Sequence, residues 1–67
     1  MRIRVNGKEM ELPEEVRTVS GLLEHLGVEK RIVVVERNRQ ILEREEHDST
    51  PLAEGDSIEI VHFVGGG

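Results

Sequence analysis

The sequence predicts an α+β fold, in which a mixed sheet of four to five strands is covered on one face by one main helix. Apolar and polar residues alternate over residues 1–12 and again over 57–63, as they do in half-buried strands. A continuous apolar run at 32–35 is typical of a strand inside a sheet. Between these segments, residues 19–26 repeat apolar side chains with helical spacing, which predicts the helix.

The first twelve residues are predicted to form a hairpin. Ile3 and Val5 alternate with arginines, and the return strand alternates apolar residues with glutamates. Asn6-Gly7 lies between the two halves and is typical of a type I′ turn, because both central residues of that turn need a positive φ. Pro13 ends the second strand, since proline cannot donate a hydrogen bond to a sheet.

The predicted helix is short and bounded at both ends. Its apolar stripe consists of Val19, Leu22, Leu23 and Leu26. Thr18 is a suitable N-cap, and Gly27 stands where a left-handed glycine ends a helix. His25 lies off the stripe and is expected to face solvent. Two to three turns are unstable alone, so the helix must pack on the sheet.

Two features are predicted between the apolar run and the charged segment. Residues 36–40 are expected to turn the chain, with Asn38 at positive φ, and 41–42 to form a short strand. The charge run at 43–48 is interpreted as a solvated surface turn. A metal site is the less favoured reading, because nothing in its spacing fixes a coordination geometry.

The last part of the chain returns to the sheet. Leu52 is expected to be buried in the core between two loops. A glycine-centred turn at 53–56 then leads into the final strand at 57–63. No internal repeat or linker interrupts the sequence, so we expect residues 1–67 to form a single domain.

Composition excludes several classes of function. A chain of 67 residues has room for one small core, and without cysteine it has neither disulfides nor a thiolate nucleophile. The formal net charge of −5 disfavours nucleic-acid binding, which needs a basic face. No apolar run approaches the roughly 18 residues of a membrane span, so no membrane interaction is expected. A cytoplasmic location is the expectation.

Three glycines, Gly65, Gly66 and Gly67, follow the final strand after one intervening residue, Val64. Glycine allows close backbone approach and unusual φ and ψ values. One interpretation is a frayed end, which is common at chain termini. The other is that residues 64–67 form a flexible tail that enters a narrow channel and presents the Gly67 carboxylate to another protein's chemistry.

Residues 50–61, followed by 63–67, resemble the C-terminal signature of the ThiS family of sulfur carriers in thiamine biosynthesis. The length, the early Val5-Asn6-Gly7 turn and the short helix also fit, so the resemblance covers the whole chain. It implies the ubiquitin-like β-grasp fold, with the first and last strands parallel at the sheet centre. One departure is that Arg39 follows Asn38, where the family commonly has Asn-Gly.

The same resemblance implies a chemistry for the tail. An E1-like enzyme would adenylate the Gly67 carboxylate, and sulfur would then replace AMP to leave a thiocarboxylate. That sulfur would pass to the thiazole ring of thiamine on a thiazole synthase. ATP and Mg²⁺ would bind the adenylating enzyme, and a cysteine desulfurase or similar protein would donate sulfur. The chain itself would bind no cofactor or metal and would act as a co-substrate, not an enzyme.

The partner-binding residues are expected beside the tail. If Ile58 and Ile60 point into the core, Val61 and Phe63 lie on the open side of the sheet, and Phe63 is the only aromatic residue of the chain. With Val64, Gly65 and Gly66 they form the predicted docking set. An alternative is that Phe63 simply packs on the sheet.

Three other functions stay open from the residues alone. A carrier of the molybdopterin type shares the fold and the tail. A ubiquitin-like modifier would ligate Gly67 to lysines of other proteins. A non-catalytic β-grasp binding module would carry the glycines incidentally.

Overall fold

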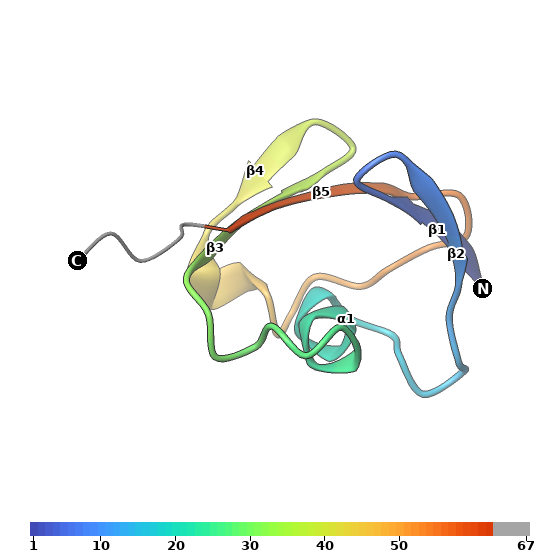
Figure 1. Ribbon diagram of the computed structural model, residues 1–67, viewed down its shortest axis with the longest axis horizontal. Coiled ribbons are helices and arrows are strands. Elements are labelled where there is room, and N and C mark those ends of the chain that lie inside the picture. The colour runs from blue at the N-terminus through green and yellow to red at the C-terminus, as the bar shows by residue number, and fades with distance from the viewer. Residues whose placement is uncertain (63–67) are drawn as a thin grey trace.

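The computed structural model describes residues 1–62, which form one five-stranded sheet with α1 lying across one face (Figure 1). The strands are β1 (Arg2–Val5), β2 (Lys8–Glu11), β3 (Val33–Arg37), β4 (Gln40–Leu42) and β5 (Ser57–His62). The helices are α1 (Val19–His25) and the short 3₁₀ helix η1 (Arg44–Glu46). The predicted α+β class is confirmed.

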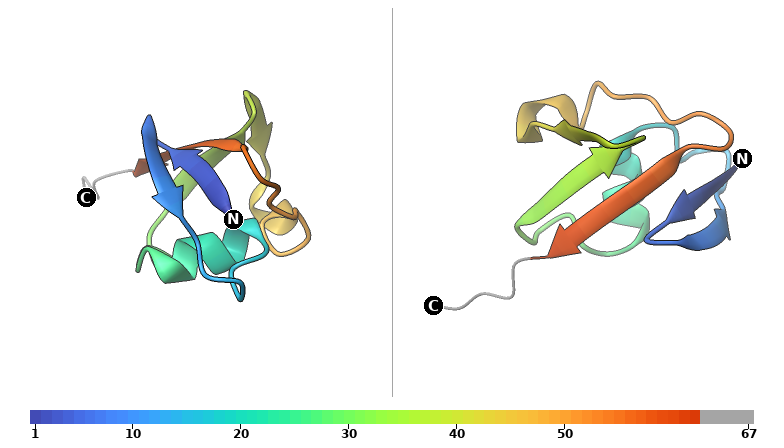
Figure 2. Two further views of the ribbon diagram at one scale, coloured as in Figure 1. Left: turned by 90° about the vertical axis from the view of Figure 1, so that its right-hand side faces the viewer. Right: turned by 90° about the horizontal axis from the view of Figure 1, so that it is seen from above.

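The strand order is β2-β1-β5-β3-β4, so β5 occupies the centre of the sheet (Figure 2). β5 runs parallel to β1 and antiparallel to β3. This is the arrangement that the family resemblance implies, with the first and last strands side by side. It means that the strand leading to residue 63 is supported by a neighbouring strand on each side.

Both hairpins turn through two residues of positive φ. Asn6 and Gly7 have φ values of 50° and 84°, as predicted, and Asn38 and Arg39 have values of 51° and 71°. The predicted turn at 36–40 is too wide, because only Asn38 and Arg39 lie outside β3 and β4. Arg39 adopts the left-handed conformation without being glycine, which costs about 1 kcal/mol. The turn between β3 and β4 thus has two residues of positive φ, although arginine stands where the family commonly has glycine.

The caps of α1 are confirmed. The Thr18 side chain accepts a hydrogen bond from the Gly21 N–H at 3.1 Å. Gly27 has a φ of 75°, and its N–H donates to the Glu24 carbonyl oxygen at 3.0 Å. The next residue, Val28, donates to the Leu23 carbonyl oxygen at 2.9 Å, which completes a Schellman motif.

The core lies between α1 and the covered face of the sheet. Its most completely buried side chains are Ile3, Val19, Leu22, Val35 and Ile58. Leu52 is buried as predicted, whereas Leu26 is only partly buried. Val16 and Val28, from the two segments that flank the helix, also join the core, although no periodic pattern marks them.

Two predictions for the segment after α1 are wrong in part. Ile32 lies outside β3 and is 70% exposed, so the apolar run enters the sheet one residue later than expected. The charge run contains η1, and His47 after it is 8% exposed instead of solvated. The Ser20 N–H donates to the His47 carbonyl oxygen at 2.9 Å, which holds this segment against the start of α1. Among the described residues, His47 Nε2 has no hydrogen-bond partner.

Asp56 is a buried carboxylate that joins its own turn to the turn between β3 and β4. It accepts hydrogen bonds from Arg37 Nε at 2.9 Å, Asn38 Nδ2 at 3.1 Å and the Ala53 N–H at 2.8 Å. Burial by itself raises the pKa of Asp56. The hydrogen bonds from Ala53, Asn38 and Arg37, with the charge of Arg37, outweigh burial and lower the pKa of Asp56 below its usual value.

We therefore expect the substitution Asp56→Asn to lower the free energy of unfolding at pH 7 by about 1–3 kcal/mol, because an amide nitrogen would face a hydrogen-bond donor. The lowered pKa also sets the pH dependence. The stability from the charged carboxylate is present above the unfolded-state pKa of about 3.9 and is lost as the pH falls through the lower folded-state pKa.

Urea unfolding between about pH 7 and pH 2 measures this effect. The wild-type advantage over Asp56→Asn should shrink as the solution becomes acidic. Glu45→Gln, at an exposed position in η1, is the matched control and should change little at any pH. If the free energies of unfolding of the wild type and Asp56→Asn differed by the same amount at every pH, the charge of the Asp56 carboxylate would contribute nothing to stability.

Candidate functional site

The candidate site begins where β5 leaves the sheet. The last described residue of β5, His62, pairs with Val33 at the beginning of β3. The predicted site residues Phe63, Val64, Gly65, Gly66 and Gly67 lie outside the described residues. Of the predicted set, Val61 alone falls within them.

The uncovered face of the sheet carries apolar side chains next to this point. Along β5, Ile58 and Ile60 are buried, whereas Val61 is 54% exposed, as the alternation predicts. Val61 pairs across the strands with Val34 of β3, which is half-buried. Ile41 of β4 is 64% exposed on the same face. We call Val34, Ile41 and Val61 the outer patch.

Two carboxylates lie beside the outer patch on the same face of the sheet. Glu36 of β3 pairs with Ile41 on one side and with Glu59 of β5 on the other. Two like charges directly opposite each other across strands are unfavourable for the isolated sheet. A basic group on a partner would relieve that repulsion. The outer patch and its carboxylates are therefore complementary to a partner surface that has apolar side chains next to basic ones.

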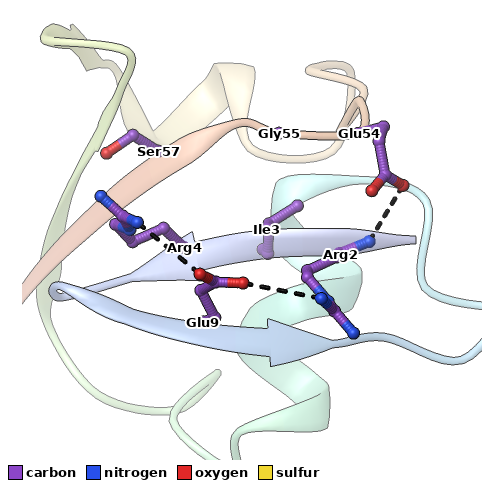
Figure 3. Close-up of a pocket in the computed structure, with 7 residues that line it drawn as sticks. All are labelled: Arg2, Ile3, Arg4, Glu9, Glu54, Gly55 and Ser57. Carbon is purple, nitrogen blue, oxygen red and sulfur yellow. Dashed lines mark hydrogen bonds and ion pairs between the residues drawn. The ribbon is translucent and has the colours of Figure 1, made fainter.

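A separate pocket of about 310 Å³ opens at the other end of β5 (Figure 3). Arg2 and Arg4 approach the Glu9 carboxylate at 3.8 Å each, and the Arg2 N–H donates to Glu54 at 3.0 Å. Its charged groups thus already have partners within the chain. Ser57, the first residue of β5, lines this pocket, whereas the tail follows the last residue of the strand. The pocket is therefore not part of the candidate site.

Two further properties of residues 1–62 bear on function. Within this range no three histidine or carboxylate side chains come together in a way that would hold a metal ion. The same residues contain no helix of the length and apolarity needed to cross a membrane.

Comparison with known families decides the relationship. The model of the ThiS family matches residues 3–67, nearly the whole chain. The chain belongs to the ThiS family. The β-grasp fold is confirmed by a crystal structure of the thiamine biosynthesis protein ThiS from Geobacter metallireducens, which is 39% identical, is covered over 100% of both chains and superposes with a TM-score of 0.83.

Two curated relatives of this ThiS-family chain carry different names. The sulfur carrier protein ThiS of Bacillus subtilis is 42% identical over 65 residues, covering 97% of this chain and 98% of the relative. A thiazole synthase of Magnetococcus marinus is 43% identical over 67 residues, covering all of this chain but 20% of the synthase. The chain thus spans about a fifth of that longer protein.

These findings confirm the family resemblance drawn from the sequence. They also confirm a sulfur carrier of thiamine biosynthesis as the class of protein, which is a carrier and not a catalyst. In the ThiS-family chain, the outer patch adds Val34 and Ile41 to the predicted Val61. The sequence contained a usable signal for Val34, because alternation from Val35 places it on the opposite face.

Proposed function

We propose that the chain carries sulfur as a thiocarboxylate on Gly67, for the thiazole ring of thiamine. The observation that carries this proposal is the position of β5. The strand is held on both sides at the sheet centre and leads straight to the residues that precede the glycines. A rigid strand is a suitable base for a carboxylate that must reach into a partner's site.

The proposed reaction has two steps on an E1-like enzyme. A carboxylate oxygen of Gly67 attacks the α-phosphorus of ATP, whose bond to pyrophosphate breaks, and an acyl-adenylate results. Sulfur at the oxidation level of hydrosulfide, supplied by a cysteine desulfurase or similar donor with a reducing thiol, then attacks the acyl carbon. The carbon–oxygen bond to AMP breaks, and the thiocarboxylate remains. ATP and Mg²⁺ belong to the adenylating enzyme.

The proposed acceptor protein is a thiazole synthase. Its support is that two proteins named thiazole synthase, from Paramagnetospirillum magneticum and Magnetococcus marinus, each match all of this chain over 20% of their own length. A carrier-like segment and the synthase name thus occur together in one polypeptide. A carrier that acts near a synthase fits this association.

Intact-mass spectrometry tests the proposal. The protein is incubated with a cognate adenylating enzyme, ATP, Mg²⁺, a cysteine desulfurase and cysteine. The expected product is heavier by the difference between one sulfur and one oxygen atom. Transfer of that sulfur in a reconstituted thiazole synthase reaction supports the thiamine assignment, and transfer to a molybdopterin precursor alone would replace it. Lysine conjugates without a thiocarboxylate would indicate a protein modifier.

We propose that the outer patch docks the adenylating enzyme, together with Phe63 and Val64. The substitution Val61→Ser should weaken binding about five- to tenfold, because a half-exposed valine loses roughly 1 kcal/mol of further burial. Isothermal titration calorimetry with the cognate enzyme measures the affinity. The matched control is Ile32→Ser, which changes an even more exposed apolar residue outside the sheet. Equal affinities for wild type and Val61→Ser would remove the patch from the interface.

A further inference from the structure

Asn6 connects the first hairpin to the central strand through three hydrogen bonds. Its backbone N–H donates to the Ile58 carbonyl oxygen at 2.9 Å. Its side-chain Nδ2 donates to the Ile60 carbonyl oxygen at 3.2 Å, and its Oδ1 accepts from the Ile60 N–H at 2.7 Å. The side-chain amide therefore binds Ile60 in the way that a neighbouring backbone would.

This contact begins where the strand ladder ends. β1 pairs with β5 through Arg4 and Val5, opposite the first two residues of β5. β1 then turns away at Asn6, so Ile60 would lose its partner on that side. The Asn6 amide replaces the missing backbone and extends the support of β5 toward His62.

The turn conformation makes the contact possible. Asn6 has a φ of 50°, in the left-handed region that asparagine and glycine tolerate better than other residues. Glycine at this position would keep the type I′ turn and remove the amide. Asn6→Gly therefore separates the side-chain contact from the turn.

We propose that Asn6 is a positioning residue for the carboxyl-terminal glycines. By holding both polar groups of the Ile60 backbone, it fixes the last part of β5 and so the point from which the tail enters a partner. The inference rests on the proposed function, because it assigns Asn6 a role in the same reaction. Asn6 acts through β5 and touches no reacting atom.

The second hairpin supplies a matched control. Asn38 has nearly the same φ, 51°, and likewise binds β5 through backbone and side chain. Its N–H donates to the Ser57 carbonyl oxygen at 2.8 Å, and its Oδ1 accepts from the Ser57 N–H at 2.9 Å. Ser57 is the first residue of β5, at the end remote from the glycines. Asn38→Gly thus removes a side-chain contact to β5 at the opposite end of the strand, and it also removes the hydrogen bond from Asn38 Nδ2 to Asp56.

Pyrophosphate exchange with the cognate adenylating enzyme distinguishes positioning from folding. A variant with a smaller folded fraction has a higher apparent KM, but kcat at saturation is unchanged. A misplaced carboxylate lowers kcat, and a displacement of about 1 Å can cost on the order of 100-fold. We expect Asn6→Gly to displace the Gly67 carboxylate by less than about 1 Å. Its kcat should therefore fall by less than 100-fold, about tenfold. For Asn38→Gly we expect a change in KM alone.

Asn6→Asp provides a second variant if Asn6→Gly folds poorly. Its carboxylate can accept from the Ile60 N–H but cannot donate to the Ile60 carbonyl oxygen. Its kcat should therefore also fall. Hydrogen exchange of the Ile60 amide should be faster in Asn6→Gly, which removes the acceptor of that N–H, than in Asn38→Gly. Wild-type kcat in both Asn6 variants, or an equal fall in Asn38→Gly, would overturn the inference and leave the proposed function intact. A wild-type protein that supports no exchange would overturn both.

Discussion

Addition of one alanine after Gly67 is expected to reduce adenylation by about 100-fold or more while the fold stays unchanged. One residue extends the chain by up to about 3.3–3.6 Å, whereas reaction requires the attacking oxygen about 3–3.5 Å from the phosphorus. The extension also moves the carboxylate onto a residue with a side chain. Because the buried core side chains come from residues between Ile3 and Ile60, thermal unfolding should be the same as for the wild type.

Two further variants make the test specific for the glycines. Deletion of Gly66 and Gly67 should also abolish adenylation, since the carboxylate would no longer reach the phosphorus. Gly66→Val should fail because a β-branched residue restricts the backbone and fills a narrow channel. Pyrophosphate exchange followed by intact-mass spectrometry measures all three. Adenylation and sulfuration of the extended protein at the wild-type rate would refute the carrier mechanism and favour a plain β-grasp binding module.

Local chemistry explains which parts of the fold the sequence predicts well. Asn6-Gly7, Thr18 and Gly27 form the turn and caps that their residue types favour, because each feature depends on a few adjacent residues. The interior of β5 is also predictable, since Ile58 and Ile60 alternate with exposed residues. These are the elements for which backbone preference and apolar pattern agree.

Long-range contacts explain what the sequence does not predict. Asp56 reads as a turn residue, but its burial depends on Arg37, 19 residues away. His47 lies in a charge run but is buried, and its carbonyl oxygen accepts a hydrogen bond from the N–H of Ser20, a residue distant in the sequence. Arg39 has a left-handed conformation because the two-residue turn between β3 and β4 requires it.

The candidate site divides in the same way. Alternation along β5 places Val61 on the open face without any knowledge of the other strands. The contribution of Ile41 appears only once β4 pairs with β3, because Ile41 then lies opposite Glu36 on that face. A role for Asn6 beyond its turn is invisible in the sequence, since Ile60 is 54 residues away.

Leu22→Ala is expected to have the largest effect on stability, a loss of about 2–5 kcal/mol. Leu22 is 0% exposed and is among the largest fully buried side chains between α1 and the sheet. Its truncation removes apolar burial and leaves a cavity that the short helix cannot fill. For 67 residues at about 0.05–0.15 kcal/mol each, total stability is about 3–10 kcal/mol, so the variant loses a large fraction of it.

Leu26→Ala is the matched control, because the same atoms are removed from a partly buried position at the end of the same helix. Its loss should be clearly smaller than that of Leu22→Ala in urea unfolding monitored by circular dichroism. Equal small losses, below roughly 0.5 kcal/mol for both, would mean that α1 does not anchor the core. With α1 displaced, the covered face of β5 would be open to water, and the strand would no longer give the tail a rigid base.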